Sequence, residues 1–228
     1  MAYDRKRKLL FIHIPKNAGK SIEIAMGFVD RKTKANPRGR SILNGIAKKF
    51  LNLTTRQKNK EMLWGPIDYV LSGQHLTCQE IELLNFIDIL EFQEALKFAV
   101  IRNPFDRAIS TFTMFTQSTS LEEFKFFWDK KSIDIKLDHN KVAHRRSQLS
   151  FLLNTRGKME VDELIRYENL DEDFQDFCKK YNFNIPILPH IGARQCLKKD
   201  YRTFYDRESK EMIQDYFKED FEAFGYVF

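Results

Sequence analysis

The sequence predicts an α/β fold in which a mainly parallel sheet is flanked by helices. Short apolar runs that suit buried strands recur along the chain, at residues 8–14, 69–71 and 97–102. Each run leads through a polar loop into a segment with helical apolar spacing or a helix-capping sequence. Strands that alternate with helices in this way are typical of parallel sheets, which bind ligands at the carboxyl ends of their strands.

The length and composition suit one globular domain over residues 1–228, since 43% of the 228 residues are hydrophobic. No apolar run approaches the roughly 20 residues that span a bilayer, and the run after the basic N-terminus is too short for a signal peptide. The cysteines are scattered, which favours a reducing compartment, and no Cys/His cluster has zinc spacing. We therefore expect a cytoplasmic protein that needs no metal.

A basic insertion is predicted over residues 31–66. Residues 31–60 hold ten Lys or Arg and no Asp or Glu, although the net charge of the whole chain is only +6. Such a segment is either a solvated insertion or a patch that attracts a polyanion or an anionic membrane surface. Nucleic acid is not expected as a partner, because no nucleic-acid-binding motif accompanies the charge.

The loop after the first predicted strand has the features of an anion site. Backbone amides at a helix start have no intrahelical partner, and Lys16 and Lys20 add positive charge beside them. A nucleotide-wrapping P-loop would need a glycine where Ile14 stands. This shorter loop, stiffened by Pro15, suits a terminal phosphate-like group better than a wrapped triphosphate.

Two further loops are predicted at strand ends. His75 follows the strand at 69–71, and Thr77 to Glu80 form a capping box that predicts a helix from Cys78. Arg102 ends the strand at 97–102, where its guanidinium can grip a phosphate through two bonds. Asn103 then caps a helix that has Pro104 at its first position.

Later segments extend the same pattern. Residues 144–153 are predicted as one helix, residues 163–170 as a strand entering a helix, and residues 206–217 as an amphipathic helix. The aromatic residues between 111 and 137 are interpreted mainly as core.

The stretch His-Ile-Pro-Lys-Asn-Ala-Gly-Lys-Ser at 13–21 resembles the 5′-phosphosulfate loop of sulfotransferases that use 3′-phosphoadenosine 5′-phosphosulfate (PAPS). Residues 102–110 resemble the 3′-phosphate motif of the same family. The most similar members are carbohydrate sulfotransferases that modify glycosaminoglycans, whose loop usually has Thr at the positions of Asn17 and Lys20. The resemblance covers residues 8–30 and 67–228, and it implies a three-layer fold like that of P-loop NTPases.

The resemblance implies a role for each matching residue. Lys16 would neutralise charge on the leaving group, and His75 would accept the proton of the acceptor. The donor would be bound by two sets of residues: Lys16, Asn17, Ala18, Gly19, Lys20 and Ser21 at the phosphosulfate, and Arg102 and Ser110 at the 3′-phosphate. Lys198 and Lys199 lie in a basic loop that closes over the nucleotide in relatives, and adenosine 3′,5′-bisphosphate would be the product.

The residues that would bind the acceptor are less clearly indicated. His144, Arg145 and Gln148 resemble a family segment that lies near the acceptor, and a structural role is an equal alternative for these three residues. As the expected base, His75 would also face the acceptor. The acceptor is expected to be a carbohydrate hydroxyl, or else an amine, and it can be polyanionic. Two other functions stay open at this stage: a P-loop kinase that uses ATP, and a polyanion-binding module without activity.

Overall fold

The computed structural model describes residues 2–28, 62–63, 73–85, 87–129, 139–184, 187–189, 191 and 200–228. The predicted strand at 69–71 and the basic residues 31–60 lie outside these ranges. The described residues form a five-stranded sheet with the order β3-β1-β2-β4-β5. The strands are β1 (Ala2–Asp4), β2 (Leu9–Ile12), β3 (Met62–Leu63), β4 (Leu96–Ile101) and β5 (Glu163–Arg166).

The sheet is parallel where the predicted site lies and antiparallel at one edge. β2 pairs with β4, and β4 with β5, in parallel. β1 pairs antiparallel with both β2 and β3. The predicted α/β fold is therefore confirmed, but the hairpin of β1 and β2 was not predicted. β3 lies within residues 31–66, the range predicted as a basic insertion.

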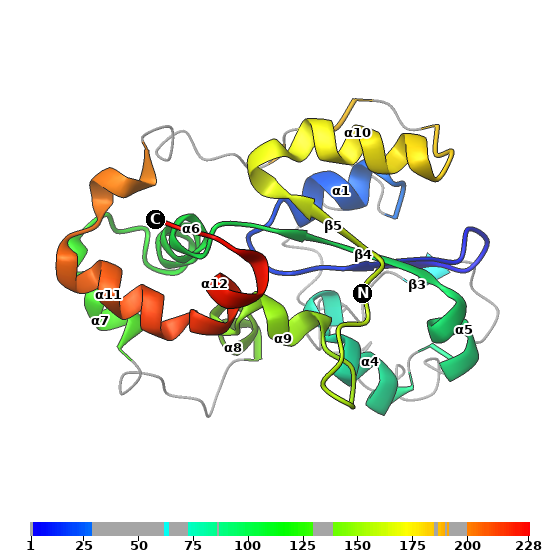
Figure 1. Cartoon of the computed structure of the whole chain (residues 1–228), viewed down its shortest axis with the longest axis horizontal. Helices are drawn as coiled ribbons and strands as arrows, with labels where there is room; N and C mark the ends of the chain where they lie inside the picture. The colour runs from blue at the N-terminus through cyan, green and yellow to red at the C-terminus, as the bar shows by residue number, and fades with distance from the viewer. Residues whose placement is uncertain are drawn as a thin grey trace, which may run out of the picture.

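Helices cover both faces of the sheet (Figure 1). One face carries α1 (Gly19–Ala25) and α10 (Leu170–Lys180), and the other carries α4 (Cys78–Leu84), α5 (Ile89–Glu94) and α9 (Gln148–Leu152). Alternate strand residues supply the two cores, because successive side chains point to opposite faces. Phe11 and Phe98 pack with α1 and α10, whereas Leu10 and Ala99 pack on the opposite side.

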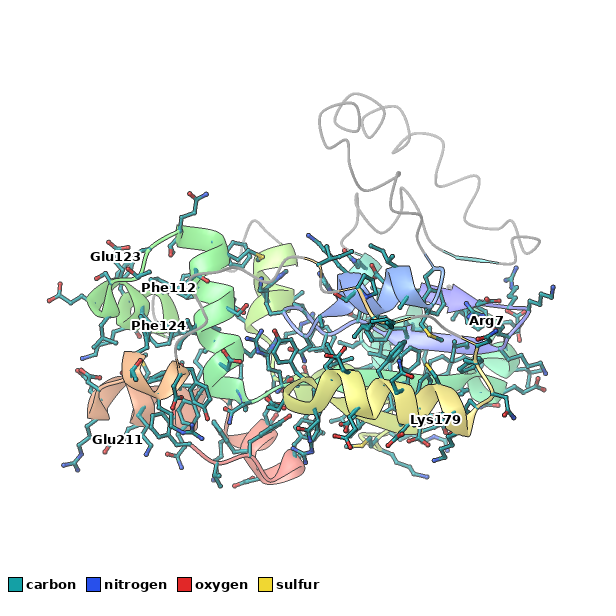
Figure 2. All side chains as sticks on the ribbon, turned by 90° about the horizontal axis from the view of Figure 1, so that it is seen from above. Arg7, Phe112, Glu123, Phe124, Lys179 and Glu211 are labelled. Atoms are coloured by element: carbon teal, nitrogen blue, oxygen red, sulfur yellow. The ribbon has the colours of Figure 1, made fainter. Side chains whose placement is uncertain are left out.

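A helical layer lies beyond the carboxyl ends of the parallel strands (Figure 1). It contains α6 (Pro104–Thr116), α7 (Leu121–Trp128), α11 (Arg207–Tyr216) and α12 (Lys218–Phe224). Its core is largely aromatic, and Figure 2 shows Phe112 of α6 beside Phe124 of α7. These rings meet edge to face with centroids 5.4 Å apart. The predicted aromatic core is confirmed, although Phe126 is exposed.

The capping signals place the helix starts as predicted. Thr77 and Glu80 form the capping box of α4, and the side chain of Asn103 accepts a hydrogen bond from the amide of Phe105 at the start of α6. The prediction of one helix over 144–153 is wrong. Helix α8 (His139–Arg145) ends at Arg145, and a separate helix, α9, begins at Gln148 because Ser147 caps it.

Single 3-10 turns complete the described elements: η1 (Gly73–His75), η3 (Tyr167–Asn169) and η5 (Tyr201–Phe204). Among the helices in the described ranges, none has both the length and the apolar character needed to cross a membrane.

Candidate active site

The two predicted anion motifs meet at the carboxyl ends of β2 and β4. Lys16 follows β2, and Arg102 follows β4, its parallel neighbour. The Nη1 group of Arg102 donates a hydrogen bond to the backbone carbonyl of Lys16 over 2.8 Å. Two segments that are 86 residues apart in sequence therefore form one surface, where open α/β sheets bind ligands.

The loop between β2 and α1 has a backbone suited to an anion. Lys16 and Ala18 adopt left-handed conformations, with φ of 71° and 57°, while Asn17 between them does not. An alternation of right- and left-handed backbone conformations can turn successive amides toward one side, and such a concave arrangement suits an anion. Helix α1 then begins at Gly19, and the amide of Ser21 already donates to the carbonyl of Ala18 over 2.8 Å. The amides of Gly19 and Lys20 precede this first bond of the helix.

The side chain of Asn17 supports the loop instead of facing a ligand. Its Nδ2 group donates to the carbonyl of Val100 and to Oε1 of Gln148, both over 2.7 Å. The amide group of Gln148 also bonds both the N–H and the carbonyl of Arg102. Gln148 is fully buried, so the structure does not support its predicted contact with the acceptor. It joins the loop to the end of β4.

A cluster of three histidine rings adjoins the loop. The rings of His13 and His75 lie 4.6 Å apart, and those of His75 and His144 lie 5.1 Å apart. The Nδ1 atom of His75 lies 3.0 Å from the carbonyl of His13 and must carry the proton there, because a carbonyl can only accept. The cluster therefore unites the two histidines that the sequence singled out.

The environment of His75 keeps its ring neutral. Burial lowers the pKa of His75 well below its ordinary value, and the neighbouring His13 and His144 lower it further. With the proton on Nδ1, the Nε2 atom carries the lone pair. Nε2 is thus the ring atom of His75 that can accept a proton.

The remaining predicted residues have mixed outcomes. Ser21 is buried, and its hydroxyl accepts a hydrogen bond from the amide of Ile191 over 3.1 Å. Ser110 is buried on α6. Arg145 stacks on the ring of Phe127, with 4.1 Å between the guanidinium carbon and the ring centroid, and its role toward an acceptor stays a prediction. Lys198 and Lys199 lie outside the described residues.

Arg107, which lies within the segment 102–110 that resembles the 3′-phosphate motif, has an internal role. Its buried guanidinium donates to the carbonyls of Pro15, His144 and Arg146. Burial lowers the pKa of Arg107 to about 10, and the negative charge of Asp220 opposes this shift. Arg107 therefore stays protonated at neutral pH and ties the anion loop to the end of α8.

Sequence reasoning missed His13 and Glu23 as members of the site. Glu23 is fully buried on α1, and its Oε1 atom lies 2.7 Å from Nδ1 of His13. The imidazole of His13 also fills the space beside Gly19. The available signal was a single acid within the apolar face of the predicted first helix.

Gly19→Ala is expected to destabilise the protein by about 1–3 kcal/mol and to weaken anion binding, because the added methyl group overpacks the site. A Cβ atom at this position would lie 1.9 Å from Nε2 of His13. Chemical denaturation measures the loss. In a His13→Ala background the same substitution should lower the free energy of unfolding much less. An equal decrease in both backgrounds would rule out this clash as the cause.

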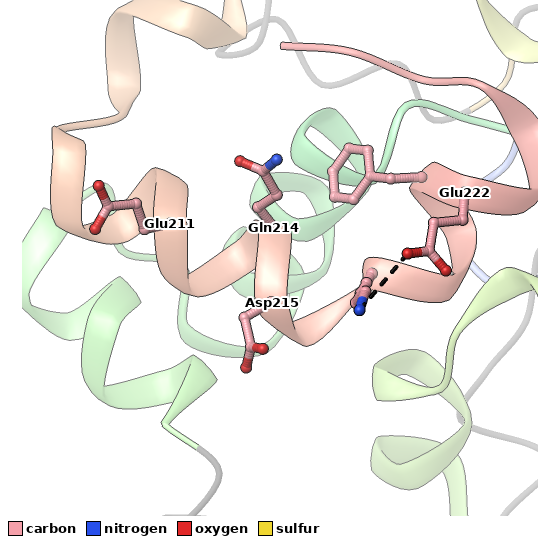
Figure 3. Close-up of a pocket in the computed structure, with 6 residues that line it drawn as sticks. Glu211, Gln214, Asp215 and Glu222 are labelled. Atoms are coloured by element: carbon pink, nitrogen blue, oxygen red, sulfur yellow. Dashed lines mark ion pairs between the residues drawn. The ribbon is translucent and has the colours of Figure 1, made fainter.

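One pocket lies apart from this cluster, on the surface of α11 and α12 (Figure 3). Its lining includes the carboxylates of Glu211, Asp215 and Glu222, the last of which pairs with Lys218. This acidic surface does not suit an anionic ligand. Within the described ranges, no group of three or more His, Cys, Asp or Glu side chains is arranged to hold a metal ion.

Comparison with known proteins identifies the family. The chain matches the model of the sulfotransferase family over residues 1–227. Searches among curated proteins and among solved structures found no match. The family match covers both anion motifs and the histidine cluster. This chain therefore belongs to the sulfotransferase family and is a sulfotransferase enzyme.

Proposed function

We propose that this sulfotransferase uses PAPS as its donor and transfers the sulfuryl group to a hydroxyl group of a carbohydrate. The observation that carries the proposal is the hydrogen bond between Arg102 and the carbonyl of Lys16. It brings the loop that resembles a phosphosulfate site next to the motif that resembles a 3′-phosphate site. A donor with anionic groups at both its 5′ and 3′ positions fits such a pair.

The loop would hold the phosphosulfate of this donor. The amides of residues 17–20 are suited to its oxygens by the left-handed turns at Lys16 and Ala18, whereas the amide of Ser21 donates to the carbonyl of Ala18. When bound, the donor supplies a sulfuryl group activated by its anhydride link to phosphate. Lys16 is only half-buried, so its ammonium group can reach the charge that develops on the leaving group.

Arg102 would recognise the 3′-phosphate, with Ser110 beside it in the motif. The guanidinium of Arg102 also pairs with Asp106 and lies 4.0 Å from the ring centroid of Tyr167. These contacts fix its position at the end of β4. An entering phosphate would compete with the carboxylate of Asp106 for the same N–H groups, which makes the affinity sensitive to both residues.

His75 would accept the proton of the attacking hydroxyl at Nε2. Its neutral ring, with Nδ1 committed to the carbonyl of His13, already has the lone pair that this step requires. The ring of His144 also adjoins the His75 ring, and His144 would contact the acceptor. The described residues that surround the reaction thus supply a base, a cation and an anion loop, and catalysis rests on positioning and charge stabilisation.

Arg102→Ala is expected to weaken binding of adenosine 3′,5′-bisphosphate by about 10-fold or more, because a charge-assisted contact is lost. Isothermal titration calorimetry measures the dissociation constant. Arg207→Ala is the control, since Arg207 is exposed on α11. An unchanged affinity in a folded Arg102→Ala protein would exclude Arg102 as the 3′-phosphate ligand.

A screen of acceptors with radiolabelled PAPS tests the proposed reaction. The proposal expects label in neutral or anionic carbohydrates, and loss of that label in Lys16→Ala. Transfer only to peptides or small phenols would contradict the carbohydrate assignment. The basic residues 31–60 stay a prediction for a polyanionic acceptor, because they lie outside the described residues.

A further inference from the structure

The carboxylate of Glu23 is a buried charge that the reaction just described does not use. It is fully buried on α1, only four residues after Gly19. Its Oε1 atom lies 2.7 Å from Nδ1 of His13, and Nε2 of Gln74 donates to its two oxygens over 3.0 and 3.1 Å. A buried carboxylate is costly unless it is well bonded, so these partners account for its presence but not for its position.

Both partners of Glu23 are attached to the proposed base. Gln74 is the residue directly before His75, in the turn η1. His13 supplies the backbone carbonyl to which Nδ1 of His75 donates. Glu23 therefore fixes His75 from two sides, through the backbone turn that carries it and through the residue that selects its tautomer.

The same carboxylate also supports the anion loop. The imidazole of His13 packs against Gly19, so closely that no side chain fits there. The orientation of this imidazole is set by its bond to Glu23. One side chain thus relates the position of the base to the position of the loop that would hold the phosphosulfate.

We propose that Glu23 is a positioning residue for the sulfuryl-transfer reaction. Through His13 and Gln74 it holds the base His75 in the tautomer whose Nε2 atom carries no proton, and at a fixed position relative to the anion loop. This inference rests on the proposed function of His75. It assigns no direct contact between Glu23 and either substrate.

Glu23→Gln tests the proposal with little change in shape. If the carbonyl of the glutamine keeps the place of Oε1, its amino group replaces Oε2 and faces the Nε2 donor of Gln74. In the opposite orientation of the amide, the amino group faces Nδ1 of His13. We expect kcat to fall about 10- to 100-fold, which is the loss seen when groups that orient the ligands of a catalytic metal are removed. The dissociation constant for adenosine 3′,5′-bisphosphate should change less than about threefold, because the proposal assigns Glu23 no contact with the donor and His13 still fills the space beside Gly19. Glu122→Gln, exposed on α7, is the matched control.

The ring nitrogens of His75 give a second readout that needs no activity. In the wild-type protein, ¹⁵N spectra of labelled histidine should show His75 protonated at Nδ1 and not at Nε2. In Glu23→Gln a fraction of His75 should change to the Nε2–H tautomer. Resonances are assigned with single histidine substitutions.

Gln74→Leu keeps the experiment decisive if Glu23→Gln fails to fold, since it leaves the His13–Glu23 pair intact. It should lower kcat and convert a fraction of His75 to the Nε2–H tautomer, as in Glu23→Gln. An unchanged tautomer together with an unchanged kcat in a folded variant would overturn the proposal. If the tautomer changes but the wild-type enzyme transfers no sulfuryl group from PAPS, the proposed function has failed and the positioning of His75 by Glu23 stands.

Discussion

His75→Ala is expected to lower turnover by about 100-fold or more while the affinity for adenosine 3′,5′-bisphosphate stays nearly unchanged. The substitution removes the lone pair at Nε2 that would accept the proton of the acceptor. It leaves the loop at residues 15–21 and the guanidinium of Arg102 in place, because their hydrogen bonds do not involve the His75 ring. Steady-state kinetics give turnover, and calorimetry gives the affinity.

His144→Ala is the matched comparison, because its ring adjoins His75 and it is equally buried. We expect a smaller loss of turnover, expressed mainly in the KM for the acceptor. If His75→Ala abolishes bisphosphate binding, His75 belongs to the donor site. If His144→Ala then shows the larger loss of turnover, His144 is the base.

Arg107→Met is expected to lower the free energy of unfolding by about 3 kcal/mol or more, because it leaves buried polar groups unpaired. The carbonyls of Pro15, His144 and Arg146 lose their common donor. The buried carboxylate of Asp220 also loses a compensating charge, although it still accepts two backbone N–H groups at the start of α9. Methionine fills similar space, so the loss reports polar interactions more than packing.

Urea denaturation compares Arg107→Met with Arg202→Met, which alters a half-exposed surface pair and should change stability by less than about 0.5 kcal/mol. Asp220→Asn should lower the free energy of unfolding less in the Arg107→Met protein than in the wild type, because the two side chains interact. A loss below about 1 kcal/mol for Arg107→Met would show that the buried guanidinium is not needed to hold the loop and α8 together.

The sequence predicts best the features that depend on neighbouring residues. The capping box of Thr77 and Glu80 predicted α4, and Asn103 with Pro104 predicted α6, because a helix start is decided within about four residues. The parallel strands β2 and β4 were visible as apolar runs. β1 was missed because its three residues are too few to show a period. The break between α8 and α9 was missed because the capping by Ser147 was not considered.

Side-chain roles were harder to predict than elements. The motif residues Lys16 and Arg102 meet as the order of the motifs suggests, but Gln148 and Arg107 are internal supports. Residue type and spacing cannot distinguish a buried amide from one that faces a substrate, because the difference depends on segments far away in sequence. Glu23 shows the opposite case: no role was predicted for it from the sequence, and only the folded chain brings it close to the residues that hold His75.

Ligand-dependent thermal stability tests the central claim, that this chain binds a donor with both a 5′ and a 3′ anionic group, most directly. The protein is heated with adenosine 3′,5′-bisphosphate, with ATP and Mg²⁺, and with heparin, since a ligand that binds only the folded state stabilises it. We expect the bisphosphate to raise the unfolding temperature, and Arg102→Ala to abolish most of that increase. Stabilisation by ATP and Mg²⁺ or by heparin, with none from the bisphosphate, would contradict the account.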